Sequence, residues 1–200
     1  MNKNIIVVSG KKGSGKDTFA DIFIRKKLIK ELSESIDFSK VVGFEKLSFA
    51  QPIKEILSVI TDKTVKELDE NKNCKLEFED KTVRDYYRLI ADSFKKIFDE
   101  NIWVRLLVKK IDENKRYIIT DLRFKNEYGI LLEKFNPIFI RIKRDVEEDN
   151  HISETNLDGL PDSNFDFIIK NTGNIENLKR EVDLFIEKLD KLWQLKKEVL

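Results

Sequence analysis

IIVVSGKKGSGKDT, residues 5–18, is the stretch of sequence that decides the fold. Its first four residues, Ile5 to Val8, are apolar and β-branched, which predicts a buried parallel strand that enters a glycine turn. From Asp17 onward, apolar residues recur at helical spacing. The order is therefore a strand, a glycine-rich loop and a helix.

The loop between this strand and helix has the spacing G-x4-G-K. Glycines let backbone N–H groups wrap around phosphates, the helix N-terminus adds a favourable potential, and the lysine reaches the transferred group. A plain glycine-rich turn is the alternative, but the strand, spacing, lysine and helix together favour a P-loop. The residues predicted to bind ATP here are Gly10, Lys12, Gly13, Ser14, Gly15, Lys16, Asp17 and Thr18.

Asp17 follows the lysine, where a P-loop usually has Ser or Thr. A carboxylate here can bind Mg²⁺ or hold one of its waters, because the ion takes oxygen ligands and keeps several waters. Thr18 would then bond an α-phosphate oxygen. Alternatively, Asp17 caps the N-terminus of the helix, and both interpretations stay open.

Length and composition set the class of protein. The 200 residues fall in the size range of a single domain. Lys plus Arg number 38 and Asp plus Glu number 37, so the formal net charge is +1, which excludes a broadly polybasic binder of nucleic acid or membranes. Cys74 is the only cysteine, and no apolar stretch approaches the roughly 20 residues that cross a bilayer. We expect a soluble protein of the cytoplasm.

Strand and helix patterns alternate along the rest of the chain. Further strands are expected within residues 41–49, 117–120, 138–142 and 165–169. Further helices are expected to open at residues 48–52 and to extend over about 82–97, 102–111 and 175–193. The charged, weakly periodic stretch 61–80 is expected to be an exposed excursion. The alternation predicts a five-stranded parallel sheet with helices on both faces, which is a three-layer α/β fold.

Four motifs together resemble those of the bacteriophage-type deoxynucleoside monophosphate kinases, a branch of the nucleoside monophosphate kinases. The first is GSGKDT at 13–18, which is also similar, more distantly, to the P-loop of animal phosphomevalonate kinases. The others are FAQPIK at 49–54, DLRFKNE at 121–127 and HISE at 151–154. They occur in the family's order, so the resemblance covers most of the chain. It implies a kinase that uses ATP and Mg²⁺ to phosphorylate a deoxynucleoside monophosphate.

The resemblance also implies how one P-loop kinase domain is divided. The core would comprise about 1–47, 102–144 and 164–200, with a helical acceptor-binding insertion at about 48–101 and a short lid at about 145–163. Its partners would be small-molecule nucleotides, without nucleic acid or membrane, and a homodimer stays open. The location would be the cytoplasm, that of the host if a phage encodes the protein.

Four residues are implied to be catalytic: Lys16, Asp121, Arg123 and Arg144. Asp121 ends a strand, where a P-loop kinase needs an acid for the hydration shell of Mg²⁺, so Asp17 and Asp121 are the metal candidates. Arg123 matches an arginine that the family places on the phosphates, although a surface ion pair with Asp121 is the alternative. Arg144 leads into the lid, whose closure would bring it onto the phosphates and expel water.

The insertion would bind the acceptor through cations. Lys54, Arg84 and Arg88 are the candidates for the phosphate, the last two being one helical turn apart. Phe49 is a candidate for stacking on the base, although such aromatics are more often core residues. Residues 84–92 retain the family's arginine but replace its Gln, Gly and Thr, so the preferred base and sugar stay open.

Four other residues have two interpretations each. Asn126 and Glu127 would help to shape the acceptor site by resemblance, with capping of the next helix as the alternative. Asn171 lies in a loop that resembles the adenine contact of P-loop kinases, and a plain turn is the alternative. His151 is the only histidine, and because this reaction needs no histidine base, a hydrogen bond within the lid is expected instead of catalysis.

Two rival functions stay open. One is another P-loop small-molecule kinase, such as a phosphomevalonate-type kinase. Its sugar-free acceptor would leave the candidate stacking aromatics, Phe49, Tyr86 and Tyr87, without a ligand. The other is a regulatory module that binds ATP without turnover. Asp121, Arg123 and Arg144 beside the P-loop argue against it, because binding alone does not need so many charges near the γ-phosphate.

Overall fold

The computed structural model describes residues 4–37, 39, 41–76, 80–146 and 151–195. The chain divides into two compact units, one formed by Met1–Leu47 with Ile111–Leu200 and the other by Ser48–Lys110. Among the described residues, no helix combines the length and the apolar character needed to cross a membrane.

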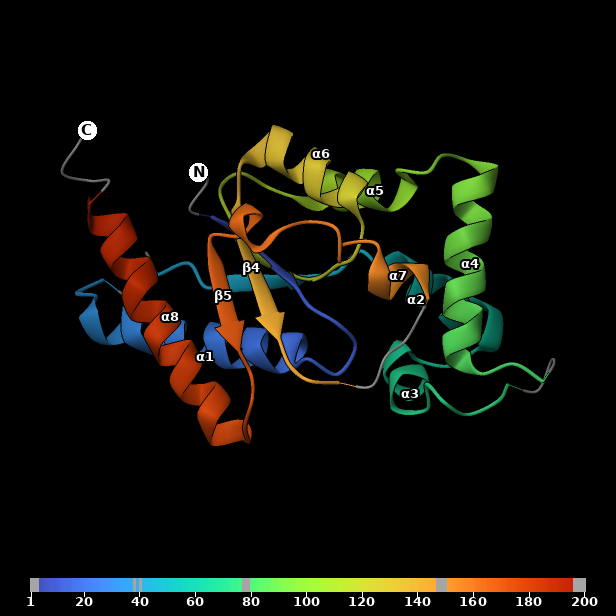
Figure 1. Ribbon diagram of the computed structural model, residues 1–200, viewed down its shortest axis with the longest axis horizontal. Coiled ribbons are helices and arrows are strands. Elements are labelled where there is room, and N and C mark those ends of the chain that lie inside the picture. The colour runs from blue at the N-terminus through green and yellow to red at the C-terminus, as the bar shows by residue number, and fades with distance from the viewer. Residues whose placement is uncertain (1–3, 38, 40, 77–79, 147–150, 196–200) are drawn as a thin grey trace. The chain divides into compact units, whose positions relative to one another are not determined.

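The first unit is built on a five-stranded sheet in which all neighbouring strands are parallel (Figure 1). The strands lie in the order β2-β3-β1-β4-β5. Their bounds are β1 Ile5–Ser9, β2 Phe44–Leu47, β3 Arg116–Leu122, β4 Ile138–Lys143 and β5 Phe167–Lys170. All five residues of β1 are buried, as expected of the central strand. The predicted parallel sheet of five strands is confirmed.

Helices of the first unit cover both faces of this sheet. On one face, α1 (Lys16–Glu34) and α8 (Ile175–Leu195) contribute Phe19 and Phe185 to a core that includes Ile140 of β4. On the other face, Tyr128 of α6 (Lys125–Phe135) packs with its ring centroid 4.3 Å from that of Phe139. Figure 1 shows α6 and α1 on opposite sides of β4. The expected three-layer α/β arrangement is therefore confirmed.

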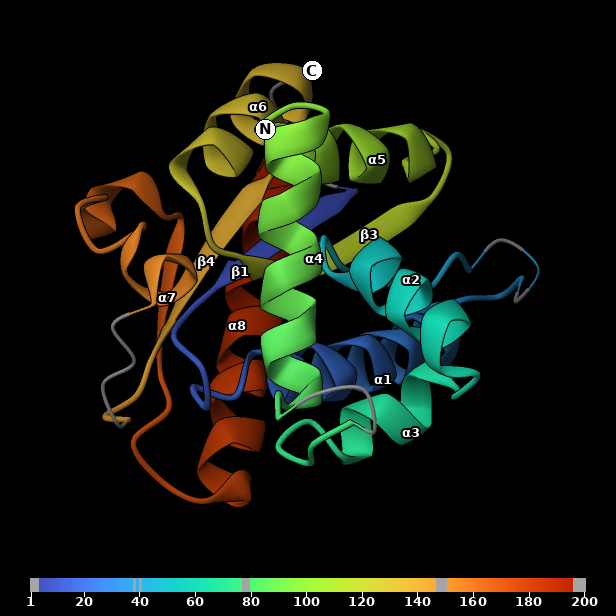
Figure 2. The ribbon, with the colours of Figure 1, turned by 90° about the vertical axis from the view of Figure 1, so that its right-hand side faces the viewer.

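The second unit is helical (Figure 2). It contains α2 (Gln51–Thr61), α3 (Val65–Glu70), α4 (Val83–Ile97) and α5 (Ile102–Lys110). Leu57, Leu68, Leu76 and Val83 form its buried cluster.

Most described residues of the stretch 61–80 are exposed, as the sequence predicts, but the stretch also contains a short helix. Thr64 accepts a hydrogen bond from the backbone of Glu67, whose side chain accepts one from the backbone of Thr64, so a capping box starts α3. The short helix carries Leu68 into the cluster, where it is 1% exposed. The sequence does not predict this helix, because the charged residues around its one buried leucine conceal the helical pattern.

The second unit extends to Lys110, whereas the resemblance implies an insertion that ends at about residue 101. Trp103 of α5 explains this boundary. Its Nε1 donates to the carbonyl oxygen of Ala91 at 3.1 Å, and its ring centroid lies 5.5 Å from that of Phe94.

Within the stretch 145–163, which the resemblance assigns to a lid, the structure has α7 (Ile152–Thr155) and a 3-10 turn, η2 (Asp162–Asn164). Residues 147–150 lie outside the described part of the chain. The backbone N–H of Ser153 donates to Nδ1 of His151, so the histidine caps α7.

Candidate active site

The P-loop follows β1, the strand that lies between β3 and β4 in the sheet. In open α/β sheets, ligands bind outside the carboxyl ends of the strands at such a point. A Cβ atom on Gly10 would lie 2.6 Å from the carbonyl oxygen of Ile142, and one on Gly15 would lie 2.6 Å from Nδ2 of Asn171. Both glycines, like Gly13, also have positive φ angles. The loop therefore runs too close to its neighbours to carry side chains there.

Lys16 is buried in this loop, and its ammonium group donates to the carbonyl oxygens of Gly10 at 2.5 Å and of Lys11 at 2.8 Å. Burial and the nearby guanidinium of Arg123 lower the pKa of Lys16 to about 8. An anion bound beside the ammonium group would favour its protonated form and raise this pKa.

Ser14 in the P-loop and Asn171 after β5 are joined by a hydrogen bond. The Oγ atom of Ser14 is buried and has no hydrogen-bond partner within the described part of the protein, so it remains able to donate to a phosphate oxygen. Nδ2 of Asn171 donates to the carbonyl oxygen of Ser14 at 2.9 Å from a position that is 3% exposed. In the structure Asn171 thus supports the P-loop, and its contact with adenine stays a prediction.

Asp17 lies in the first turn of α1, followed by the exposed Thr18. Its Oδ1 atom is 3.0 Å from Nζ of Lys46 and accepts a hydrogen bond from Oγ1 of Thr120 at 3.1 Å. Partial desolvation by the surrounding protein opposes ionisation of this largely exposed side chain, but the hydrogen bonds and charge of these partners outweigh it and lower the pKa of Asp17. The N-cap residue of α1 is Gly15, without a side-chain cap. The carboxylate therefore bonds to β2 and β3 rather than to the end of its own helix.

Asp121 and Arg123 stand at the end of β3. The charge of Asp121 acts on Lys16, raising the pKa of the lysine against the larger effects of burial and Arg123. The backbone N–H groups of Arg123 and Phe124 both donate, at 3.0 Å, to Oε2 of Glu127. Glu127 is buried, and through these two bonds its carboxylate caps the N-terminus of α6, which is one of the two interpretations that the sequence leaves open. Its role at an acceptor site, and that of the neighbouring Asn126, stay predictions.

Glu154 is a site residue that the sequence analysis did not assign. Its side chain is 4% exposed and forms an ion pair with Arg123. Its Oε2 atom accepts a hydrogen bond from the backbone N–H of Lys12 at 2.8 Å. The HISE motif placed this residue in the lid, but nothing in the pattern distinguished it from the other acidic residues nearby.

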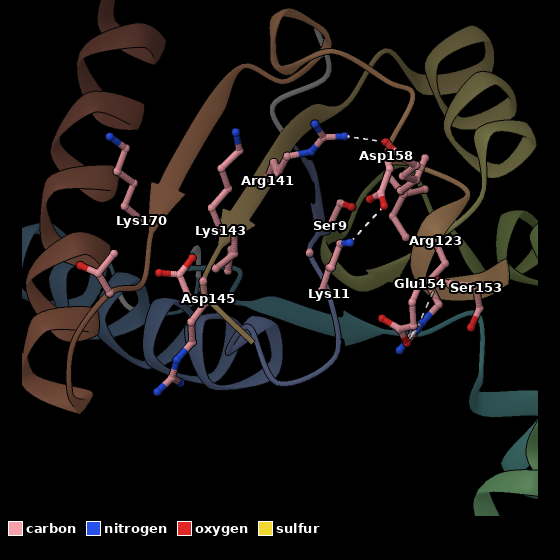
Figure 3. Close-up of a pocket in the computed structure, with 16 residues that line it drawn as sticks. Ser9, Lys11, Arg123, Arg141, Lys143, Asp145, Ser153, Glu154, Asp158 and Lys170 are labelled. Atoms are coloured by element: carbon pink, nitrogen blue, oxygen red, sulfur yellow. Dashed lines mark hydrogen bonds and ion pairs between the residues drawn. The ribbon is translucent and has the colours of Figure 1, made fainter. Parts of the chain in front are cut away.

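A pocket of about 480 Å³ lies in the first unit beside these residues (Figure 3). Its size is that of a small-ligand site. The walls bring Gly10 of the P-loop together with Arg123 and Arg144, which come from three different parts of the chain. The cationic side chains in the lining are Lys11, Arg123, Arg141, Lys143, Arg144 and Lys170, and the acidic ones are Asp145, Glu154 and Asp158. An anionic ligand suits this excess of positive charge.

The acceptor candidates that the resemblance assigns to the insertion lie in the second unit. Phe49 is 4% exposed. Nζ of Lys54 is 2.7 Å from Oδ2 of Asp69. Arg84 and Arg88 are both on α4, and Nε of Arg84 is buried without a hydrogen-bond partner among the described residues. The arginine Nε is therefore available to an anion.

No cluster of three or more His, Cys, Asp or Glu side chains suited to a metal ion occurs in the described ranges. Asp17 and Asp121 both lie near Lys16, because the charge of each carboxylate acts to raise the pKa of that lysine. Two carboxylates are compatible with Mg²⁺, which proteins commonly hold through one or two carboxylates, waters and the phosphates of a nucleotide.

Comparison with known proteins gives one matching family model and several similar solved structures. Residues 87–182 match the family model of deoxynucleotide monophosphate kinase. No curated protein matches the chain. Among solved structures, a dephospho-CoA kinase from Campylobacter jejuni is 22% identical, with a TM-score of 0.46 and coverage of 94% of this chain and 98% of that one. A gluconokinase from Sinorhizobium meliloti 1021 is 11% identical, with a TM-score of 0.48 and 97% coverage of both chains.

The matched stretch 87–182 contains Arg123, Arg144 and Glu154. It begins within α4 and does not include the P-loop, which is recognised by its own spacing and geometry. The resemblance that the motifs indicate is therefore confirmed: the chain is similar to the deoxynucleotide monophosphate kinases, and this similarity supports a P-loop nucleotide kinase.

Proposed function

We propose that the protein is a deoxynucleoside monophosphate kinase, which transfers the γ-phosphoryl group of ATP to a deoxynucleoside monophosphate and yields ADP and the diphosphate. One observation carries this proposal: the pocket joins the P-loop to Arg123 and Arg144 in a chain whose residues 87–182 match that family. A site that only binds a nucleotide does not need two arginines beside the loop that holds the phosphates.

The residues of the P-loop fit ATP. The positive φ angles of Gly10, Gly13 and Gly15 suit a loop that wraps around phosphates, and the Oγ atom of Ser14, which has no partner among the described residues, can donate to one. Lys16 would contact the transferred group from its buried position. Asp17 and Asp121 would hold Mg²⁺ or its waters, and the ion would neutralise charge on the phosphates.

The acceptor would bind to the second unit through its phosphate. Arg84 is the best candidate because its buried Nε lacks a partner in the part of the chain that the structure describes. Leaving a buried donor unpaired costs about 1–3 kcal/mol, and a phosphate oxygen would remove this cost. Lys54 would have to exchange its ion pair with Asp69 for the phosphate, so we assign it a secondary role.

Catalysis would then rest on positioning and charge. Lys16, Arg123 and Arg144 would stabilise the negative charge that spreads over the transferred phosphoryl group. The acceptor oxygen already belongs to a phosphate anion, so no strong general base is needed. This agrees with the position of His151, which caps α7.

A panel of acceptors tests the proposal. ADP release from ATP and Mg²⁺ would be followed with each common deoxynucleoside and ribonucleoside monophosphate, with phosphomevalonate, and without acceptor. We expect release that depends on at least one deoxynucleoside monophosphate. Turnover with phosphomevalonate alone would establish the rival kinase, and ATP binding without any acceptor-dependent release would establish the regulatory module.

A further inference from the structure

Glu154 connects three parts of the first unit. It lies on α7, its Oε1 atom pairs with a guanidinium nitrogen of Arg123 after β3, and its Oε2 atom accepts from the backbone N–H of Lys12 in the P-loop. The carbonyl oxygen of Ser153 accepts a second bond from the same guanidinium nitrogen, at 3.4 Å. Figure 3 shows Arg123, Ser153 and Glu154 together at one end of the pocket.

The burial of this carboxylate makes its contacts specific. At 4% exposure, its side chain has little access to water, and a buried carboxylate is tolerated where it is paired and hydrogen-bonded. Such a pair contributes little net stability, but it holds its partner in one orientation. Arg123 is therefore anchored through a single nitrogen of its guanidinium group.

The rest of the guanidinium group remains available. Nε and the second terminal nitrogen of Arg123 have no partner among the described residues, and a guanidinium carries five N–H donors in a planar fork. The arginine lines the same pocket as Gly10 and Lys11 of the P-loop. Its charge is also close enough to Lys16 to lower the pKa of that lysine.

We infer that Glu154 is a positioning residue: it holds Arg123 beside the P-loop so that the free donors of the guanidinium group meet the phosphates of ATP. This inference rests on the proposed function. Glu154 would contact no substrate itself. Because it also binds the backbone of Lys12, it fixes the distance between the arginine and the loop.

The test is a double-mutant cycle in kcat for the best acceptor. Glu154→Gln keeps the length of the side chain and an oxygen for the Lys12 N–H but removes the charge that pairs with Arg123. We expect kcat to fall by about tenfold to a hundredfold, the effect of misplacing a catalytic group by about 1 Å, with little change in KM for the acceptor. In an Arg123→Ala background the same change should have no further effect on kcat, because its target is gone.

Glu31→Gln is the matched control. Glu31 forms a comparable, partly buried pair with Arg116, at 2.7 Å, in the same unit. The control should lose thermal stability to a similar extent while its kcat stays at the wild-type value. Equal losses of kcat in Glu31→Gln and Glu154→Gln, or losses that add fully in the Arg123→Ala background, would overturn the inference.

Two further measurements test the role of Glu154 separately from the proposed function. If Glu154→Gln does not fold, Glu154→Asp keeps the charge but is one methylene too short to reach both partners, and its cycle with Arg123→Ala replaces the first. The ATP affinity of all variants, measured by calorimetry without acceptor, should show the same non-additivity. Non-additive ATP affinities with no phosphorylation of any monophosphate would refute the proposed function and support the role of Glu154, whereas full additivity with active enzyme would do the reverse.

Discussion

At the scale of single residues, the P-loop is prepared for an anion before any ligand binds. Lys16 is held by two carbonyl oxygens, and its burial disfavours the charged form. The Oγ atom of Ser14 lies buried without a partner in the described structure. A bound phosphate would supply a counter-charge for the ammonium group of Lys16 and a hydrogen-bond acceptor for the Oγ atom of Ser14.

ATP binding should therefore take up a proton at Lys16. The pKa of about 8 lies below the usual lysine value, and bound phosphates should raise it. The free protein then loses the proton as the pH rises through 8 while the complex keeps it, so affinity should fall by up to about tenfold per pH unit above 8. Calorimetric dissociation constants between pH 7.5 and 9.5 test this, in a range where the terminal phosphate is already ionised.

Lys16→Arg is the control for this pH dependence, because a guanidinium stays charged over the whole range. The slope should disappear in that variant. The same slope in both proteins would assign the titration to another group.

Asp17 should set the Mg²⁺ requirement. Its carboxylate is tied to Lys46 and Thr120, so a metal ion must compete with an ammonium group for it. Asp17→Ser provides the commoner P-loop ligand and removes this competition. We expect substantial activity with an altered Mg²⁺ midpoint, read from a titration of kcat against free Mg²⁺. An unchanged midpoint would show that Asp17 has only a structural role.

At the scale of elements, the sequence predicts the strands and long helices better than the short ones. Strands β1 and β4 are found where the sequence predicts them, because both lie inside a parallel sheet and are mostly buried and apolar. The helix α3 was missed, because six residues carry too little periodicity. Glu127 shows a similar limit for a single residue. The motif alone cannot tell whether its side chain caps a helix or helps to bind a substrate.

Leu68 tests the importance of α3. Because the residue is 1% exposed within the cluster of the second unit, Leu68→Ala should lower the free energy of unfolding by about 2–5 kcal/mol. Chemical denaturation gives this value. Val59→Ala on α2 is the control, since Val59 is 83% exposed and its removal should have little effect. Equal effects of the two substitutions would mean that α3 is as peripheral as its charged sequence predicts.

Helix α4 should carry the recognition of the acceptor. A charge-assisted contact between Arg84 and a phosphate contributes about 1.5–3 kcal/mol, so Arg84→Ala should raise KM for the monophosphate by about tenfold to a hundredfold. KM for ATP should barely change. Lys96→Ala removes an exposed cation from the last turn of the same helix and should affect neither constant. Equal increases in both constants for Arg84→Ala would place the acceptor elsewhere.

At the scale of the whole molecule, the sheet explains how site residues that are far apart in sequence come to lie together. The order β2-β3-β1-β4-β5 places the ends of β3 and β4 on either side of the P-loop, so Arg123 and Arg144 reach one pocket. The alternation of strands and helices predicts a parallel sheet but not this order, which depends on packing between distant segments. Glu154 could not be predicted for the same reason, because its partners come from two other segments.

The transfer of a labelled γ-phosphate tests the central claim most directly. ATP radiolabelled in its γ-phosphate would be incubated with the protein, Mg²⁺ and each deoxynucleoside monophosphate, and the products separated by chromatography. We expect label in a deoxynucleoside diphosphate, formed in equal amount with ADP, and a rate lower by about a thousandfold or more in Lys16→Ala, which loses the charge on the transferred group. Label found only in ATP and inorganic phosphate, with every acceptor and with folded protein, would contradict the claim.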